Sequence, residues 1–147
     1  MLKPLDTKTF LSHAREWVEE GKQVRLMISG SSMSPFLIHA RDCITFSKPA
    51  RALRKGDMVF SQRDTGEYVM HRICRVEQDA YYLIGDAQTV VEGPIQREQI
   101  FALVTQALRK GQTIAPGDFW WEFFARVWPS IVPLRRAIIS IYRFFQR

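Results

Sequence analysis

The sequence predicts a mainly β domain built from antiparallel strands, with one helix before it and a long amphipathic helix after it. Short runs of alternating apolar and polar residues recur between residues 24 and 108, and turn-forming residues such as those at 63–66 separate them. Strands at such short spacing favour antiparallel pairing. From residue 116 the composition shifts to closely spaced aromatic and aliphatic residues. We therefore divide the chain into an N-terminal helix at 1–22, a β domain at 23–115 and an amphipathic helix at 116–147.

The N-terminal helix is expected over residues 7–20. Asp6 can cap its first turn and Gly21 can end it. The apolar side chains of this segment fall on one face at helical spacing, and they are Phe10, Leu11, Ala14, Trp17 and Val18.

The β domain begins with a strand that leads into a serine-rich loop. The expected strands cover residues 24–28, 42–47, 57–62, 67–77, 81–84 and 100–108. A basic, proline-containing connection occupies 48–55, and we expect a loop over 85–93.

The overall charge indicates which partners to expect. The chain has 147 residues and a formal net charge of +6, which favours anionic surfaces. No RNA-binding or helix-turn-helix signature is present, so a lipid surface is favoured over nucleic acid. Basic residues gather near the C-terminus as Arg126, Arg135, Arg136, Arg143 and Arg147.

Three features that would assign the chain to other classes are missing from the sequence. Residues 1–10 lack the apolar segment of a secretory signal, and no uninterrupted run of about 18 apolar residues suggests a spanning helix. Cys43 and Cys74 fit no metal motif, and the sequence leaves open whether they pair. We expect neither a metal nor an organic cofactor. The oligomeric state is not predicted.

The C-terminal segment reads as an amphipathic helix. Its polar positions recur in steps of three and four and form one narrow stripe, and Pro129 and Pro133 are expected to kink the helix. A helix lying in a membrane interface, with Trp and Arg at headgroup level, accounts for the wide aromatic face. The alternative is a helix packed on its own domain or on a partner.

The serine-rich loop over 28–37 contains Gly30, Ser31, Ser32, Met33 and Pro35. Small residues allow a tight turn and leave amide N–H groups free to point at a ligand. Such a turn could aim a serine hydroxyl at a carbonyl and hold the resulting oxyanion. The alternative is an ordinary Ser/Gly loop.

A serine nucleophile needs a base, and His71 lies within an expected strand. The near-neutral pKa of histidine suits this role, although a strand histidine can also be structural. His39 is either a loop histidine or a substrate contact. Two carboxylates in the 85–93 loop, Asp86 and Glu92, could orient His71, and spacing alone does not choose between them.

Four motifs in this order resemble the type I signal peptidase family and its relatives, the LexA-type self-cleaving repressors. The family's Ser/Gly-x-Ser-Met-x-Pro motif is matched by Gly30-Ser31-Ser32-Met33-Ser34-Pro35, and its Gly-Asp-hydrophobic strand motif by Gly56-Asp57-Met58-Val59. The base before an arginine is matched by His71-Arg72, as in the endoplasmic-reticulum, archaeal and sporulation-type branch. That branch then has Gly-Asp-Asn-Asn and an acid six residues after the Asp, where this chain has Gly85-Asp86-Ala87-Gln88 and Glu92.

The resemblance implies that Ser32 is the nucleophile and His71 the base of a serine endopeptidase. Such an enzyme cleaves signal or leader peptides after small residues, and Met33, Phe36 and Leu37 are candidate pocket walls. This chain departs from the family because it lacks a spanning helix before the nucleophile, has Gly30 where some members have an oxyanion serine, and has Glu92 in place of Asp. We expect peripheral membrane attachment through 116–147, with the catalytic side facing the cytoplasm. The alternatives are a non-catalytic peptide-binding module on the same fold and a LexA-type self-cleaving regulator.

Overall fold

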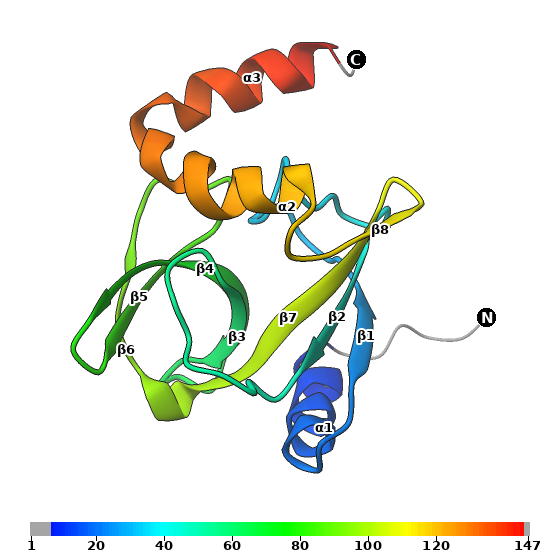
Figure 1. Ribbon diagram of the computed structural model, residues 1–147, viewed down its shortest axis with the longest axis vertical. Helices are drawn as coiled ribbons and strands as arrows, with labels where there is room; N and C mark the ends of the chain where they lie inside the picture. Colours follow the sequence, from blue (N-terminus) through cyan, green and yellow to red (C-terminus); the bar gives the residue numbers. More distant parts are fainter. Residues whose placement is uncertain (1–6, 146–147) are drawn as a thin grey trace.

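In the computed structural model, which describes residues 7–145, eight antiparallel strands form one sheet between an N-terminal helix and a C-terminal helical segment (Figure 1). The fold class predicted from the sequence is confirmed. The elements before the C-terminal segment are α1 (Thr7–Glu19), β1 (Val24–Met27), β2 (Cys43–Ser47), β3 (Met58–Gln62), β4 (Tyr68–Glu77), β5 (Ala80–Ile84), β6 (Glu92–Gln96), η1 (Arg97–Gln99), β7 (Ile100–Arg109) and β8 (Gln112–Ile114). The expected cap Asp6 lies outside the described residues.

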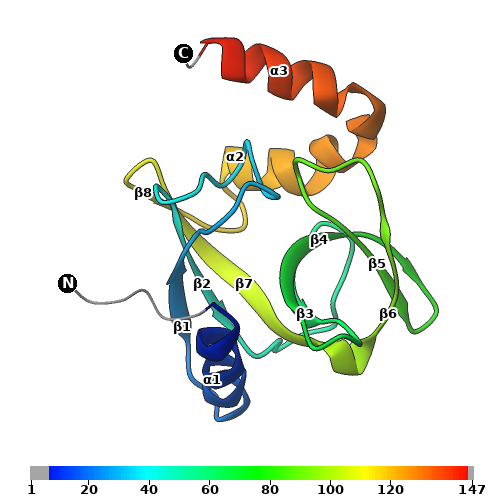
Figure 2. The ribbon, with the colours of Figure 1, turned by 180° about the vertical axis from the view of Figure 1, so that it is seen from behind.

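The sheet has the strand order β1-β2-β7-β3-β4-β5-β6, with β8 paired to the end of β7. The long strand β7 pairs with both β2 and β3 and so joins the two halves of the sheet. Figure 2 shows that the sheet curls, so that β3–β6 bend round beside the flatter part made by β1, β2 and β7. This curvature brings the start of β4 towards β1, although three strands, β2, β7 and β3, lie between β1 and β4 in the pairing order.

Two short strands were not predicted from the sequence. β6 begins at Glu92, inside the segment expected to be a loop, and it contains Gly93 and Pro94. Both residue types are disfavoured in strands, but β6 is an edge strand, where the missing proline N–H costs no hydrogen bond to a neighbour. β8 returns along β7 through a turn at Lys110 and Gly111, which both have positive φ angles (52° and 78°), as a tight hairpin turn requires.

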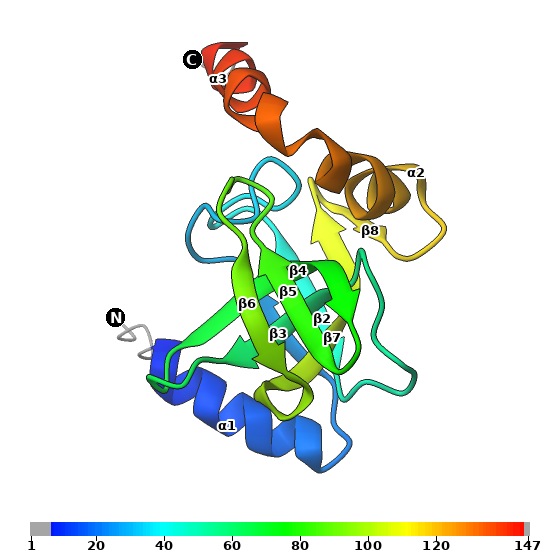
Figure 3. The ribbon, with the colours of Figure 1, turned by 90° about the vertical axis from the view of Figure 1, so that its left-hand side faces the viewer.

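The α1 helix closes one end of the sheet, as Figure 3 shows. Leu11, Ala14 and Val18 are buried in the main core, which confirms the predicted apolar face. Trp17, at the margin of that face, is 37% exposed.

The C-terminal segment is helical, and it folds back on itself at the two prolines. It consists of α2 (Phe119–Glu122), η2 (Phe123–Val127), η3 (Trp128–Leu134) and α3 (Arg135–Phe145), which together we call the C-terminal hairpin. The predicted kink is confirmed, because Ile131 has non-helical dihedral angles (φ −115°, ψ 31°) and α3 runs back over α2 (Figure 1).

Part of the aromatic face of the C-terminal hairpin covers its own domain. Trp121, Phe124 and Trp128 are buried, and the Phe36 ring lies 4.8 Å from Phe124 and 6.1 Å from Trp121, centroid to centroid. The rest of the face stays exposed, at Phe119, Trp120, Val127, Leu134, Ile141, Phe144 and Phe145. Within residues 7–145, no helix has the length and apolar character needed to cross a membrane.

Candidate functional site

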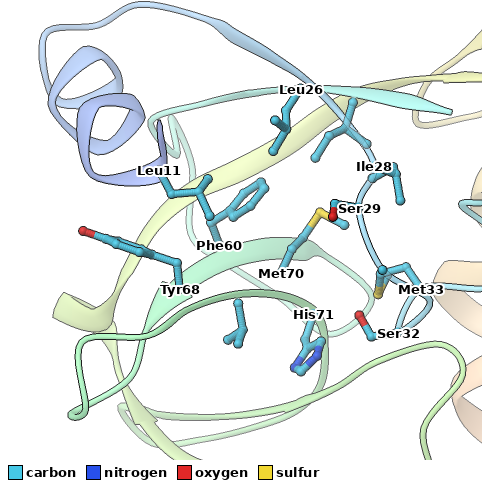
Figure 4. A pocket seen from close by; sticks show the side chains of 13 residues that line it. Leu11, Leu26, Ile28, Ser29, Ser32, Met33, Phe60, Tyr68, Met70 and His71 are labelled. Carbon is cyan, nitrogen blue, oxygen red and sulfur yellow. The ribbon is translucent and has the colours of Figure 1, made fainter. Parts of the chain in front are cut away.

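An apolar cavity of about 190 Å³ lies between β1 and the beginning of β4 (Figure 4). Among the described residues, β1 pairs only with β2, and residues 68–71 of β4 pair only with β3. Each wall therefore has a strand edge whose backbone groups the sheet does not use. The cavity is lined by Leu11, Leu26, Ile28, Ser29, Gly30, Ser32, Met33, Ile44, Phe60, Tyr68, Val69, Met70 and His71.

Ser32 and His71 lie together at one end of this cavity, and Leu11, Leu26 and Tyr68 lie at the other (Figure 4). Ser32 stands in the turn after β1, which Gly30 begins with a φ of +86°. This dihedral favours glycine because it has no Cβ. The Ser32 amide makes no hydrogen bond to any residue that the structure describes, so its N–H can donate to a bound group.

His71 lies in β4 opposite Val59 and is 5% exposed. Burial lowers the pKa of His71 below its ordinary value of 6.5, the charge of Glu92 raises it and that of Arg63 lowers it. The imidazole is therefore mainly neutral at pH 7 and able to accept a proton. Among the described residues, Nδ1 of His71 has no hydrogen-bond partner, and no hydrogen bond joins His71 to the Ser32 hydroxyl.

The two candidate acids have different surroundings. Asp86 is fully buried and accepts two hydrogen bonds of 2.9 Å from Nε and Nη2 of Arg72, which is 1% exposed. The third guanidinium nitrogen of Arg72 donates to the Gly56 carbonyl at 2.9 Å. Asp86 thus forms a buried ion pair that ties the strand motif at Gly56 to the loop after β5. Among the described residues it makes no hydrogen bond to His71, although its charge, like that of Glu92, raises the His71 pKa.

Glu92 is the carboxylate that shares a space with His71. Both residues line a second cavity of about 420 Å³. Arg63 donates to Oε1 of Glu92 from Nε at 2.8 Å and from Nη2 at 2.7 Å. Oε2 of Glu92 is buried without a hydrogen-bond partner among the described residues, as is Nδ1 of His71. A carboxylate oxygen and a ring nitrogen in one cavity can bond directly or through one water molecule.

The loop over 85–88 holds the backbone of Ser32. β5 ends opposite Arg72, so this loop leaves the sheet beside His71. The Ala87 amide donates to the Ser32 carbonyl at 2.8 Å, and a Cβ at Gly85 would lie 2.5 Å from that same oxygen. Glycine at 85 is therefore required by close packing against the serine turn.

The remaining predicted site residues have mixed positions. Gly30 and Met33 line the cavity, whereas Pro35 is buried outside its lining and Ser31 is exposed. The Gly30 amide donates to Nδ1 of His39 at 2.9 Å, so His39 supports the turn and this amide is not free for an oxyanion. Phe36 and Leu37 were expected to form pocket walls, but they are wholly buried and do not line the cavity. Phe36 instead packs under the C-terminal hairpin.

No metal-binding cluster of three or more His, Cys, Asp or Glu side chains occurs within residues 7–145. Cys43 and Cys74 are free thiols, and burial raises the pKa of Cys74. A scan against protein-family models, a search of curated proteins and a search of solved structures each gave no significant match to this chain.

Sequence reasoning did not identify three residues that support the site. Arg63, Trp128 and Arg135 hold Glu92 and the loop over 85–88 through contacts between residues far apart in the chain. By sequence, Arg135 is only one of the basic residues that gather near the C-terminus, whereas in the structure it is fully buried. No local sequence pattern indicates these contacts, because each depends on how the C-terminal hairpin, or the turn between β3 and β4, packs against a distant part of the domain.

Proposed function

We propose that this protein is a serine endopeptidase in which Ser32 is the nucleophile, His71 the general base and Glu92 the residue that orients His71. The observation that carries the proposal is that Ser32 and a buried, mainly neutral His71 line the same end of one apolar cavity. The order of motifs in the sequence gives independent support. Glu92 is preferred to Asp86 because Arg72 already uses both carboxylate oxygens of Asp86.

In this mechanism His71 accepts the Ser32 hydroxyl proton as the serine oxygen bonds to the substrate carbonyl carbon. In this proposal the Ser32 amide donates to the oxyanion. The carbon–nitrogen bond then breaks, and the leaving amine takes the proton from His71. Water attacks the resulting ester, His71 accepts one water proton, and transfer of that proton to Ser32 restores the enzyme while releasing the acid. All atoms come from the peptide and water.

The cavity suits an extended peptide with small or apolar side chains. Its two walls are the outer edge of β1 and the unpaired edge of residues 68–71, so a peptide laid between them can add backbone hydrogen bonds as an extra strand. The lining is dominated by aliphatic and methionine side chains such as Leu26, Ile28 and Met70. A secretory signal peptide has an apolar segment followed by small residues at its cleavage site, which fits this lining.

A fluorophosphonate probe tests the nucleophile directly. We expect covalent labelling of the wild-type protein, with the adduct mapped by mass spectrometry to Ser32, and no labelling of Ser32→Ala. Ser12→Ala is a matched control, because Ser12 is a partly exposed α1 serine outside the cavity whose hydroxyl donates to the Thr9 carbonyl. An unlabelled wild-type protein, or an adduct on another serine, contradicts the proposal.

One observation favours a second function, peptide binding without cleavage. Among the described residues, Ser32 Oγ makes no hydrogen bond to His71, whereas the groove between the two strand edges is fully formed. A binding module predicts that apolar peptides bind wild-type and Ser32→Ala equally and that neither protein reacts with the probe.

We further propose that the exposed face of the C-terminal hairpin attaches the protein to anionic membranes. Phe144 and Phe145 are 70% and 79% exposed at the end of α3, and the net charge of +6 complements acidic headgroups. Ile141 and Leu134, each 58% exposed, extend the apolar surface along the same helix and the turn before it.

A further inference from the structure

The first residue of α3 makes an unusual set of contacts for a surface helix. Arg135 is 0% exposed, and all its hydrogen-bond acceptors are backbone carbonyls: Gly85 and Gln88, each at 2.9 Å, and Trp128 at 3.2 Å. Beside it, the indole N–H of Trp128 donates to the Asp86 carbonyl at 2.7 Å. Two side chains of the C-terminal hairpin thus bind three of the four residues in the loop over 85–88.

The opposite side of the same loop contacts the serine turn. The fourth residue, Ala87, donates its amide proton to the Ser32 carbonyl at 2.8 Å, and Gly85 packs against that oxygen. The loop over 85–88 therefore lies between the C-terminal hairpin and Ser32, and it contacts both directly. A displacement of the loop must move the Ser32 backbone or break this hydrogen bond.

We propose that Arg135, assisted by Trp128, is a positioning residue for Ser32, so that the C-terminal hairpin is part of the catalytic scaffold as well as a surface for attachment. The inference rests on the proposed role of Ser32 as nucleophile. The planar guanidinium presents several donors in a fixed fork, which a lysine ammonium cannot reproduce. The Trp128 ring, whose centroid lies 5.5 Å from the guanidinium carbon, and the Asp86 charge offset part of the cost of burying Arg135. Burying a guanidinium that donates only to carbonyls is still costly, so an apolar side chain would serve better if the site needed only hydrophobic packing.

The decisive variant is Arg135→Met, which keeps an apolar stem and removes the donors. We expect its labelling by the fluorophosphonate probe to fall at least about tenfold, because a shift of about 1 Å in a reacting group can cost about a hundredfold in rate. The pH midpoint of labelling should not move, since His71 and Glu92 are untouched. Arg75→Met is the matched control, because Arg75 is an exposed arginine on the distal part of β4.

Two further measurements separate positioning from general damage. Hydrogen exchange should accelerate at the Ala87 amide in Arg135→Met while the α1 amides keep wild-type protection. In Arg135→Ala, which leaves room for the ion, methylguanidinium at sub-denaturing concentration should restore part of the labelling rate. If Arg135→Met does not fold, Arg135→Lys and Trp128→Phe replace it, each with a smaller expected loss of labelling.

The outcomes distinguish this inference from the proposed function. If wild-type protein is labelled and every folded variant at 135 and 128 is labelled at the wild-type rate, the positioning role is overturned while the nucleophile stands. If wild-type protein is not labelled, the nucleophile fails, and the Ala87 exchange rate alone then decides whether Arg135 holds the serine turn. Unchanged exchange in Arg135→Met overturns that role as well.

Discussion

Replacing Asp86 by Asn tests whether this residue is structural or catalytic. The ion pair between Asp86 and Arg72 is buried on both sides, at 0% and 1% exposure, with two hydrogen bonds of 2.9 Å. Asn keeps the shape but can accept only one of the two guanidinium N–H groups, and it leaves the charge of Arg72 uncompensated. Removing one partner of a buried pair typically costs about 3–5 kcal/mol. This is a large part of the roughly 5–15 kcal/mol that stabilises an ordinary domain.

Urea unfolding followed by tryptophan fluorescence measures this loss. With a denaturant slope of about 2 kcal/mol per molar, the midpoint should fall by roughly 2 M. The control is Glu77→Gln, which breaks a pair with Arg75 in which both side chains are 56% exposed, so that at most about 1 kcal/mol is expected. A midpoint for Asp86→Asn equal to that of Glu77→Gln would refute the reasoning. At low temperature the folded fraction of Asp86→Asn should still react with the probe at Ser32.

Further predictions concern His71 and the hairpin. Burial lowers the pKa of His71, so as pH falls the imidazole is protonated in the unfolded chain before it is protonated in the folded protein. The free energy of unfolding of the wild type should therefore decline below about pH 6.5 more than that of His71→Gln, as measured by urea titrations. Labelling of Ser32 should rise through a pKa below 6.5; a midpoint well above it would instead indicate a lysine base. Glu92→Gln should lower the pH midpoint of labelling and Arg63→Met should raise it, since the two charges act on the His71 pKa with opposite sign. Shifts in the same direction would contradict the assignment of His71 as the base. The double variant Phe144→Ser and Phe145→Ser should bind anionic vesicles at least about tenfold more weakly in flotation. The control Val76→Ser, on the β4–β5 hairpin, should bind them as the wild type does. An equal loss of binding in both variants would exclude α3 as the attachment surface.

The sequence was sufficient to predict the main strands and the two residues at the end of the cavity. Runs of apolar and β-branched residues between turn-forming residues located β4 and β7 to within one residue at each end. These runs could not reveal β6, since Gly93 and Pro94 argue against a strand and only the edge position allows one. Nor could the sequence choose between Asp86 and Glu92, because the choice depends on which arginine each carboxylate meets.

The two arginines that bind these carboxylates reach them in different ways. Arg72 follows His71 in β4, so its side chain leaves the opposite face of the strand and reaches Asp86 where β5 ends. Arg63 lies at the turn between β3 and β4 and reaches Glu92 only because β6 folds back along β5. The first contact follows from strand geometry once the sheet is known, and the second requires a strand that local sequence preferences did not indicate.

The position of the C-terminal hairpin changes how membrane attachment should be tested. Deleting the segment from residue 116 would remove the exposed Phe144 and Phe145, but it would also remove Trp128 and Arg135 from the loop that holds Ser32. With a truncated protein that neither binds vesicles nor reacts with the probe, the two proposed roles of the hairpin, membrane attachment and positioning of Ser32, could not be told apart. Substitutions on the exposed face alone keep the buried contacts intact, so they can separate attachment from catalysis. If the two roles are coupled through the hairpin, vesicles should change the labelling rate of wild-type protein and leave that of the Phe144 and Phe145 variant unchanged.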